Sequence, residues 1–172
     1  DDSERAFARV TVALAKFHAN KRCIPVVAEA MEALGGMGYV EDTTLPMFYR
    51  EAPLNGIWEG SGNVIALDIL RTLAREPLAR QALDAALGAA VGQDARYDAA
   101  LAETRARWPT GAEEGEARAF AERTATLLTA AELIRHAPNF VASGYVTTCV
   151  VGEAKVIGAA RGIGEGIAQR FV

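Results

Sequence analysis

The chain has 172 residues, of which 51% are hydrophobic and 23% charged, and its net charge at pH 7 is −4. This composition excludes a disordered or low-complexity polypeptide and is enough for a real core. Residues 1–74 carry 7 Lys/Arg and 10 Asp/Glu, and residues 75–172 carry 11 and 12. Because no basic block stands out, the composition gives no support for nucleic-acid binding.

The sequence also disfavours a membrane-spanning protein and a protein stabilised by disulfides or zinc. The most apolar stretch contains Glu153 and Lys155 and lacks a long uncharged run, so we expect no membrane span. The two cysteines are too few for a disulfide framework or a zinc site, so we expect no bound metal. A reducing, cytoplasmic compartment fits this cysteine usage.

Apolar residues at helical spacing, in a chain rich in alanine, predict helices throughout. The first is expected to begin at Ser3 and to reach Leu34, where a pair of glycines ends it. Pro25 either kinks this helix or marks the start of a second one. Residues 36–62 are dense in glycine and proline and predict irregular backbone, with one short helix around residues 45–50.

The second half of the chain is also expected to be helical. Asp94 can cap one of its helices, and Thr110 with Glu113 has the spacing of a capping box for the next. The expected helices span about residues 62–75, 78–90, 95–108, 111–136 and 140–169. We therefore predict an all-α, antiparallel helical bundle with a long Gly/Pro-rich loop and a C-terminal helical extension. The bundle segment is assigned to residues 1–75, and residues 76–172 are the extension packed on it.

Two coupled motifs lie about 25 residues apart. Residues 32–39 read Glu-Ala-Leu-Gly-Gly-Met-Gly-Tyr, and residues 57–63 read Ile-Trp-Glu-Gly-Ser-Gly-Asn, with Tyr-Arg-Glu at 49–51 between them. This pattern resembles the C-terminal helical domain of flavin-dependent acyl-CoA dehydrogenases and is most similar to the AidB-like, alkylation-response branch. The resemblance covers residues 1–75 well and residues 76–172 only loosely.

The second motif has the chemistry of an anion site. Gly60 and Gly62 flank Ser61 immediately before a helix, so backbone N–H groups and a hydroxyl face outward at a positive helix end. Such a site suits a dinucleotide pyrophosphate, and the resemblance implies that Ser61 and Asn63 bind FAD. Ser and Asn stand where the commoner family pattern has Thr and Gln.

The first motif has three glycines, Gly35, Gly36 and Gly38, which allow backbone to approach a ligand closely because none carries a Cβ. The resemblance implies that these turns contact the adenine end of FAD, often on a neighbouring subunit. The alternative interpretation is that the glycines only end a helix and turn the chain.

Glu59 is the candidate catalytic residue. The resemblance implies that its carboxylate removes the α-proton of an acyl-CoA thioester while the β-hydride passes to flavin, with Trp58 and Gly60 binding substrate. Burial under the acyl chain would raise the pKa of this carboxylate and make it a better base near neutral pH. The alternatives are that Glu59 is a solvated loop residue or that the base lies on another helix, as in some relatives.

Three functions remain open at this stage. The resemblance implies an FAD-dependent acyl-CoA dehydrogenase of fatty acid metabolism. Its partners would be an acyl-CoA substrate, an electron-transfer flavoprotein as acceptor, and further copies in a homo-oligomer (dimer or tetramer). The alternatives are a DNA-associated alkylation-damage-response flavoprotein and a helical fragment that oligomerises without cofactor. The near-balance of charge favours the enzyme, although folding could gather Arg96, Arg105, Arg107 and Arg118 on one face.

The remaining signals are assigned to structure. The chain lacks the N-terminal helical and middle β-domains expected of the family, so alone it is expected to be inactive. Residues 156–166 imitate a dinucleotide-binding glycine motif, but only eight residues follow Gly164, which is too short for the rest of that fold. His18 and His136 are isolated and are expected to be structural. Arg50 is expected to tie the glycine-rich loop to a carboxylate, the alternative being that it reaches a cofactor phosphate.

Overall fold

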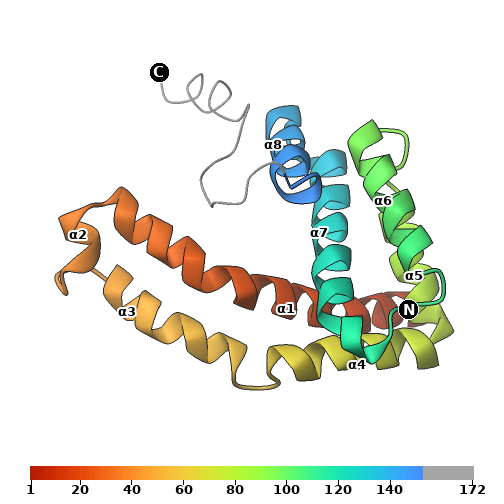
Figure 1. The fold of residues 1–172 in the computed structure, drawn as a ribbon, viewed down its shortest axis with the longest axis horizontal. Helices are drawn as coiled ribbons and strands as arrows, with labels where there is room; N and C mark the ends of the chain where they lie inside the picture. Colours follow the sequence, from red (N-terminus) through yellow and green to blue (C-terminus); the bar gives the residue numbers. More distant parts are fainter. Residues whose placement is uncertain (153–172) are drawn as a thin grey trace.

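The structure is a computed structural model that describes residues 1–152. Within that range every regular element is helical and there is no strand, so the all-α prediction is confirmed. The helices are α1 (Asp2–Ala33), α2 (Gly36–Tyr39), α3 (Leu45–Glu51), α4 (Gly62–Arg75), α5 (Pro77–Gly88), α6 (Ala95–Arg107), α7 (Ala117–His136) and α8 (Asn139–Tyr145) (Figure 1). Short turns of other helix types are η1 (Ala52–Gly56), η2 (Glu114–Glu116) and η3 (Val146–Val150).

Helix α1 is the spine of the molecule. Asp1, rather than the predicted Ser3, caps it: the Asp1 carboxylate accepts hydrogen bonds from the backbone N–H groups of Ser3 and Glu4. The helix continues through Pro25 to Ala33, so the proline does not begin a new helix. A proline removes one backbone hydrogen bond, and here the elements that pack along both halves of α1 hold the helix together.

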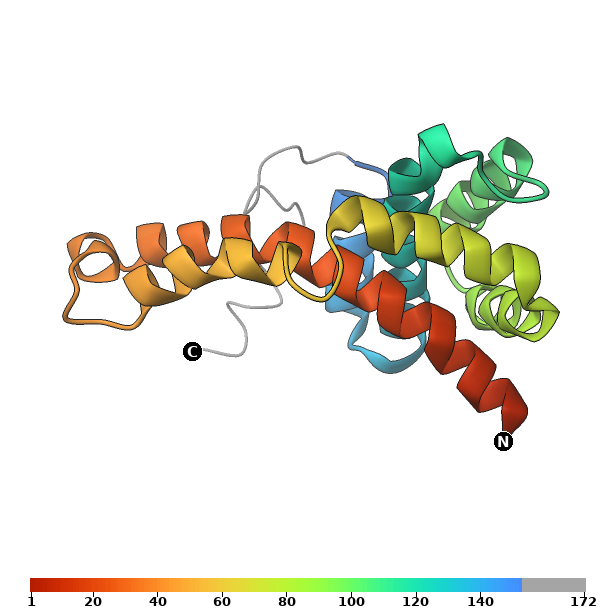
Figure 2. The same cartoon turned by 90° about the horizontal axis from the view of Figure 1, so that it is seen from below.

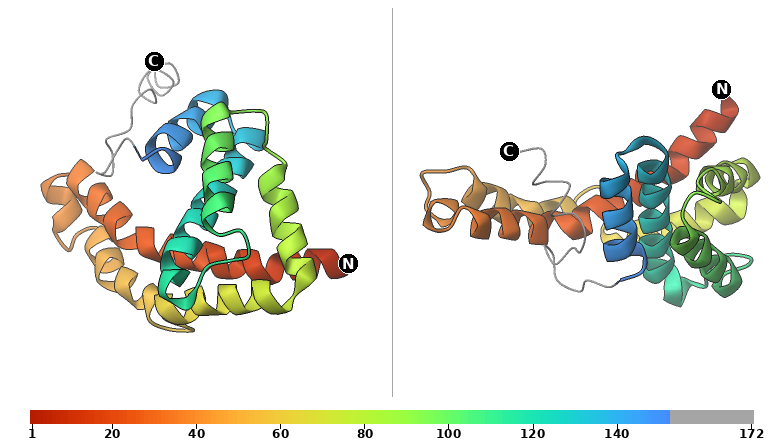
Figure 3. Two further views of the ribbon diagram at one scale, coloured as in Figure 1. Left: turned by 45° about the vertical axis from the view of Figure 1, so that its right-hand side comes forward. Right: turned by 90° about the horizontal axis from the view of Figure 1, so that it is seen from above.

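Two regions follow from how the other helices meet α1. The N-terminal half of α1 packs with α4, α5 and α7 around one core, which includes Leu14 of α1, Ile69 of α4 and Leu127 of α7. The C-terminal half of α1 forms a projecting arm with α2 and α3 (Figures 1 and 2). Further views show this arm clear of α5–α8 (Figure 3). The core thus draws on both segments that we distinguish, residues 1–75 and 76–172.

The glycine- and proline-rich segment 36–62 is more regular than predicted. It contains α2, the expected short helix α3, and η1. Pro46 and Ala52 are buried where this segment packs on α1. Packing therefore orders a segment whose composition by itself predicts irregular backbone.

The later helix boundaries test the capping predictions. Asp94 caps α6 as expected, because its carboxylate accepts hydrogen bonds from the N–H groups of Arg96 and Tyr97. The predicted capping box at Thr110 and Glu113 is wrong, since α7 begins only at Ala117 after the η2 turn.

The final predicted helix, residues 140–169, can be compared with the structure only up to residue 152. Helix α8 ends at Tyr145 and continues as the π-turn η3 to Val150. Residues 153–169 of the predicted helix, which include the whole glycine motif at 156–166, lie outside the described residues. Among the residues that the structure describes, no helix is long and apolar enough to cross a membrane.

Candidate functional site

The loop between η1 and α4 carries the predicted catalytic and substrate-binding residues, Trp58, Glu59 and Gly60. Trp58 is 55% exposed and the Glu59 side chain 86% exposed, so both are accessible from outside the fold. The backbone turns sharply here, with φ +53° at Glu59 and +109° at Gly60. The structure therefore brings these three residues together on one accessible turn.

The N-terminus of α4 follows this loop directly and has the form of the predicted anion site. Ser61 is the N-cap residue, but its hydroxyl makes no capping hydrogen bond and remains available. A Cβ on Gly62 would lie 2.9 Å from Lys21 Cε and 3.0 Å from Lys21 Nζ. Glycine at this position thus lets a lysine ammonium approach the positive end of the helix.

Arg118 of α7 adds a second cation to the same place. Its Nη1 donates a hydrogen bond of 3.0 Å to Asn63 Oδ1, and both residues line a hollow of about 250 Å³. Two cations beside the free N–H groups of a helix N-terminus suit a phosphate group. Nothing in the sequence pointed to Lys21, and Arg118 stood out only as part of a possible DNA-binding face, because neither belongs to a motif and Arg118 lies 55 residues from Asn63.

The glycine turn lies elsewhere, at the tip of the arm. Gly35 has φ +58°, and the Cβ positions of Gly35 and Gly36 have open space around them. Gly38 is buried, and a Cβ on it would lie 2.7 Å from the Cα and the carbonyl carbon of Met31. Gly35 and Gly36 are thus open to a ligand, whereas Gly38 is required by the packing of α2 on α1.

The two candidate cofactor regions are not adjacent. Lys21 lies within α1 and Gly35 just beyond its end, 14 residues further along the sequence, which at about 1.5 Å per residue is about 20 Å. Figure 1 shows α2 at the end of the arm and the start of α4 beside the middle of α1. One phosphate group cannot contact both.

Arg50 ties the arm together, as predicted. It donates hydrogen bonds of 2.6 and 3.1 Å to the two carboxylate oxygens of Glu41, and this pairing lowers the pKa of Glu41. Both residues line a cavity of about 420 Å³ between α3 and the end of α1. The pair fixes α3 against the segment that follows α2.

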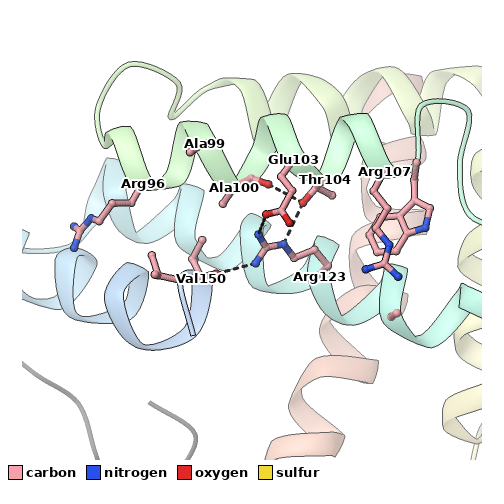
Figure 4. Close-up of a pocket in the computed structure, with 11 residues that line it drawn as sticks. Arg96, Ala99, Ala100, Glu103, Thr104, Arg107, Arg123 and Val150 are labelled. Carbon is pink, nitrogen blue, oxygen red and sulfur yellow. Dashed lines mark hydrogen bonds and ion pairs between the residues drawn. The ribbon is translucent and has the colours of Figure 1, made fainter. Parts of the chain in front are cut away.

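The arginines that could form a DNA-binding face are dispersed. Arg96 and Arg107 line a groove of about 650 Å³ between α6 and α7 together with Arg123 (Figure 4). Arg105 lines a different cavity, and Arg118 of α7 contacts Asn63 at the start of α4. Folding therefore does not gather the four predicted arginines on one face.

The guanidinium groups of this groove hold helices together. Arg123 donates to Thr104 Oγ1 at 3.1 Å and to the Val150 carbonyl at 2.8 Å, and it lies 3.5 Å from Glu103 (Figure 4). Arg107 donates to Glu116 at 2.6 Å while its guanidinium stacks on an indole ring. Their donors are used within the protein, which leaves few for a phosphate backbone.

His18 has the structural role expected of it. Arg22 donates one hydrogen bond of 3.1 Å to His18 Nδ1 and another of 2.7 Å to Glu122 on α7. Burial, together with the neighbouring guanidinium, lowers the pKa of His18. The neutral imidazole thus supports Arg22, which joins α1 to α7 through Glu122.

Comparisons with known proteins agree with these motifs. Residues 1–74 match the family model of the acyl-CoA dehydrogenase C-terminal domain. AidB of Escherichia coli (strain K12) is 45% identical over 114 residues, which are 66% of this chain and 21% of AidB. Acyl-CoA dehydrogenase family member 11 of Caenorhabditis elegans is 42% identical over 73 residues, 42% of this chain and 12% of that protein.

A solved structure extends the similarity over the fold. Caenorhabditis elegans ACDH-11 in complex with C11-CoA superposes with a TM-score of 0.66 at 25% identity, covering 99% of this chain and 33% of that one. The chain thus spans about a fifth of AidB and a third of ACDH-11. The family match includes α1, the glycine turn and the whole of the Trp58–Asn63 loop. Residues 1–74 therefore belong to the acyl-CoA dehydrogenase family, as its C-terminal domain.

Proposed function

We propose that this chain is the C-terminal helical part of an FAD-dependent acyl-CoA dehydrogenase in which Glu59 is the α-proton base. The observation that carries the proposal is the family match over a segment that presents Glu59 on an accessible turn next to an anion site. The C11-CoA complex of ACDH-11 supports an acyl-CoA thioester as the substrate class.

Glu59 is placed to accept a proton from outside the fold. Its Oε2 lies 3.9 Å from Lys16 Nζ, which is beyond hydrogen-bond distance, so the carboxylate oxygens keep lone pairs for a substrate. In the proposed step, the bond between the α-carbon and its hydrogen breaks and the proton passes to Glu59. The electron pair of the broken bond forms the new carbon–carbon double bond as the β-hydride leaves. The exposed Trp58 indole gives the acyl chain an apolar wall.

The residues at the start of α4 fit the pyrophosphate of FAD. We assign Ser61, Asn63 and the first N–H groups of α4 to this group, with Lys21 and Arg118 supplying positive charge. Bound FAD would supply the acceptor for the β-hydride.

The glycine turn is assigned to a second cofactor contact. Gly35 and Gly36 are open and lie about 20 Å from the start of α4 along α1. We therefore propose that they contact the adenine end of FAD held by a neighbouring subunit of a homo-oligomer, with Gly38 fixing the turn.

The activity belongs in this proposal to a longer polypeptide, because the chain spans 21% of AidB. From the family resemblance we also propose an electron-transfer flavoprotein as the acceptor and a place in fatty acid metabolism. The reducing cytoplasm expected from the cysteine usage stays a prediction.

A second candidate is favoured by one observation, the 45% identity to AidB. In that case the protein would be a flavoprotein of the alkylation-damage response that associates with DNA. The dispersed, internally paired arginines of α6 and α7 argue against DNA binding by that groove.

The test uses the full-length protein, mixed anaerobically with short, branched and aromatic acyl-CoAs while flavin bleaching is followed. Glu59→Gln keeps the shape of the side chain but removes the proton acceptor, and we expect bleaching to slow by about 10² to 10⁴. Glu51→Gln removes a carboxylate from the exposed end of α3 and is the matched control. Flavin content is expected to be unchanged in both variants.

Two results would contradict the proposal. Equal bleaching rates in the wild type and Glu59→Gln would place the base elsewhere. If no thioester bleaches the wild-type flavin, the damage-response function is favoured instead.

A further inference from the structure

The loop that carries Glu59 is held by side chains from one face of α1. Lys16 Nζ donates hydrogen bonds to the backbone carbonyls of Trp58 at 3.0 Å and of Glu59 at 2.8 Å. One turn further along α1, Asn20 Nδ2 donates to the carbonyl of Asn55. Side chains four residues apart share a helix face, so Lys16 and Asn20 together form one clamp on the loop.

The backbone at Glu59 needs such support. Among the described residues Glu59 is the non-glycine residue with positive φ, at +53°. A residue with a Cβ is disfavoured in this conformation and keeps it only where surrounding contacts impose it. Gly60, which follows with φ +109°, tolerates such a φ without a side-chain penalty. The constraint is thus concentrated at Glu59.

Lys16 binds the two groups that define this conformation. The carbonyl of Trp58 belongs to the peptide plane before the Glu59 Cα, and the carbonyl of Glu59 belongs to the plane after it. The relative orientation of these planes sets φ and ψ of Glu59 and hence the direction of its Cα–Cβ bond. A single ammonium that bonds to both carbonyls therefore fixes where the Glu59 side chain starts.

The surroundings of Lys16 suit this task. Its side chain is only 26% exposed, so the ammonium is held against the loop instead of moving freely in water. The ammonium has three donors, of which the two carbonyls take two. The ammonium also forms an ion pair with Glu59 Oε2 at 3.9 Å, which is too long for a hydrogen bond, so the carboxylate oxygens keep their lone pairs to accept a proton.

We propose that Lys16 is the positioning residue for Glu59, holding the two peptide planes that flank it so that the carboxylate faces the substrate. This inference rests on the proposed function only in taking Glu59 as the base. A misplacement of about 1 Å at a reacting group can cost about 10²-fold in rate, so the loss of the clamp has a measurable effect.

The experiment compares Lys16→Met, Lys16→Arg and Arg5→Met. Lys16→Met removes the donors, Lys16→Arg keeps a cation with several N–H groups, and Arg5→Met removes a charge from the exposed start of the same helix. In the full-length protein with saturating acyl-CoA, we expect Lys16→Met to bleach flavin about 10- to 100-fold more slowly. Its flavin content should be normal, and the loss should lie in kcat more than in KM. Lys16→Arg should recover most of the rate, and Arg5→Met should match the wild type.

A second readout needs neither flavin nor substrate. In the 172-residue chain, the amide N–H groups of Ile57 and Trp58 both donate to the Leu54 carbonyl. Lys16→Met should speed their hydrogen exchange by about 10-fold, because loosening the loop raises its local opening. If circular dichroism shows that this variant does not fold, Lys16→Gln, which is shorter but still polar, is measured in its place.

The outcomes separate the two proposals. Slow bleaching in Glu59→Gln, with wild-type bleaching and exchange in Lys16→Met, overturns the role of Lys16 and leaves the base assignment intact. Wild-type bleaching in Glu59→Gln overturns the base assignment, and the exchange measurement still decides whether Lys16 holds the loop. An equal effect of Arg5→Met and Lys16→Met would also overturn the role of Lys16. The slower bleaching would then come from the loss of a positive charge on α1 and not from the two hydrogen bonds to the loop.

Discussion

Replacing Gly38 with alanine tests why glycine stands at this position of the Gly-Gly-Met-Gly turn in the arm. The new Cβ would lie 2.7 Å from the Cα and the carbonyl carbon of Met31. Carbon atoms pack at about 3.5–4.0 Å, so α2 would have to move away from α1 by about 1 Å. Gly36 is the matched control: it lies in the same helix, its φ is not positive, and its Cβ position is open among the described residues.

The magnitude follows from two opposing effects. Glycine to alanine in a helix adds about 0.5–1 kcal/mol of stability by reducing the freedom of the unfolded chain. Forcing extra atoms into a packed site costs about 1–3 kcal/mol. We therefore expect G36A to be slightly more stable than the wild type and G38A less stable than G36A by about 2 kcal/mol. This difference corresponds to a factor of about 30 in the equilibrium between docked and undocked α2.

The loss should appear as local opening, because α2 lies at the tip of the arm and outside the main core. The assay is hydrogen exchange of the Val40 amide, whose N–H donates to the Gly36 carbonyl at 3.1 Å. Exchange should be about 30-fold faster in G38A than in G36A. Equal protection in the two variants would refute the packing argument and would return Gly38 to the group of ligand-contacting glycines.

The remaining predictions concern the core and its titratable groups. Leu14→Ala should lower the free energy of unfolding by about 3 kcal/mol in urea titrations because Leu14 is 1% exposed, whereas Val12→Ala, on an exposed face of the same helix, should change it by less than about 0.5 kcal/mol. The buried Tyr97 hydroxyl donates to the Leu87 carbonyl at 2.7 Å, and burial raises the pKa of Tyr97 to about 12. Stability should therefore fall as pH rises from about 10 to about 12, and Tyr97→Phe should remove this part of the fall and cost about 1 kcal/mol at pH 7. Because the pKa of His18 is lowered in the folded chain, its contribution should be complete above about pH 6.5 and be lost as pH falls below that value. His18→Gln should flatten the pH dependence of the urea midpoint, and a midpoint that rises on acidification would contradict this assignment.

Helix boundaries were predictable where the deciding contact is local. Gly62 and Arg75 bound α4 as expected, and Asp94 caps α6 through its own neighbours in sequence. Such contacts span at most a few residues, so sequence spacing contains the information.

The predictions failed where contacts between residues further apart in the sequence decide the local structure. The expected capping box at Thr110 and Glu113 does not form, and α7 starts later. Glu116 instead accepts hydrogen bonds from Arg107 and from the Trp108 indole, which fixes the η2 turn before the helix. Likewise, packing on α1 orders the glycine-rich segment that its composition marks as irregular.

For the candidate site, the sequence by itself determined the residues of the loop, Glu59 and Ser61, because these form contiguous motifs that require no knowledge of the fold. Only the tertiary structure decided which cationic side chains lie beside Glu59 and Ser61. Lys16, Lys21 and Arg118 come from α1 and α7, and they reach the loop because α4 packs beside both helices. No local pattern specifies these three residues, since their positions depend on how distant helix faces bury their apolar side chains against one another.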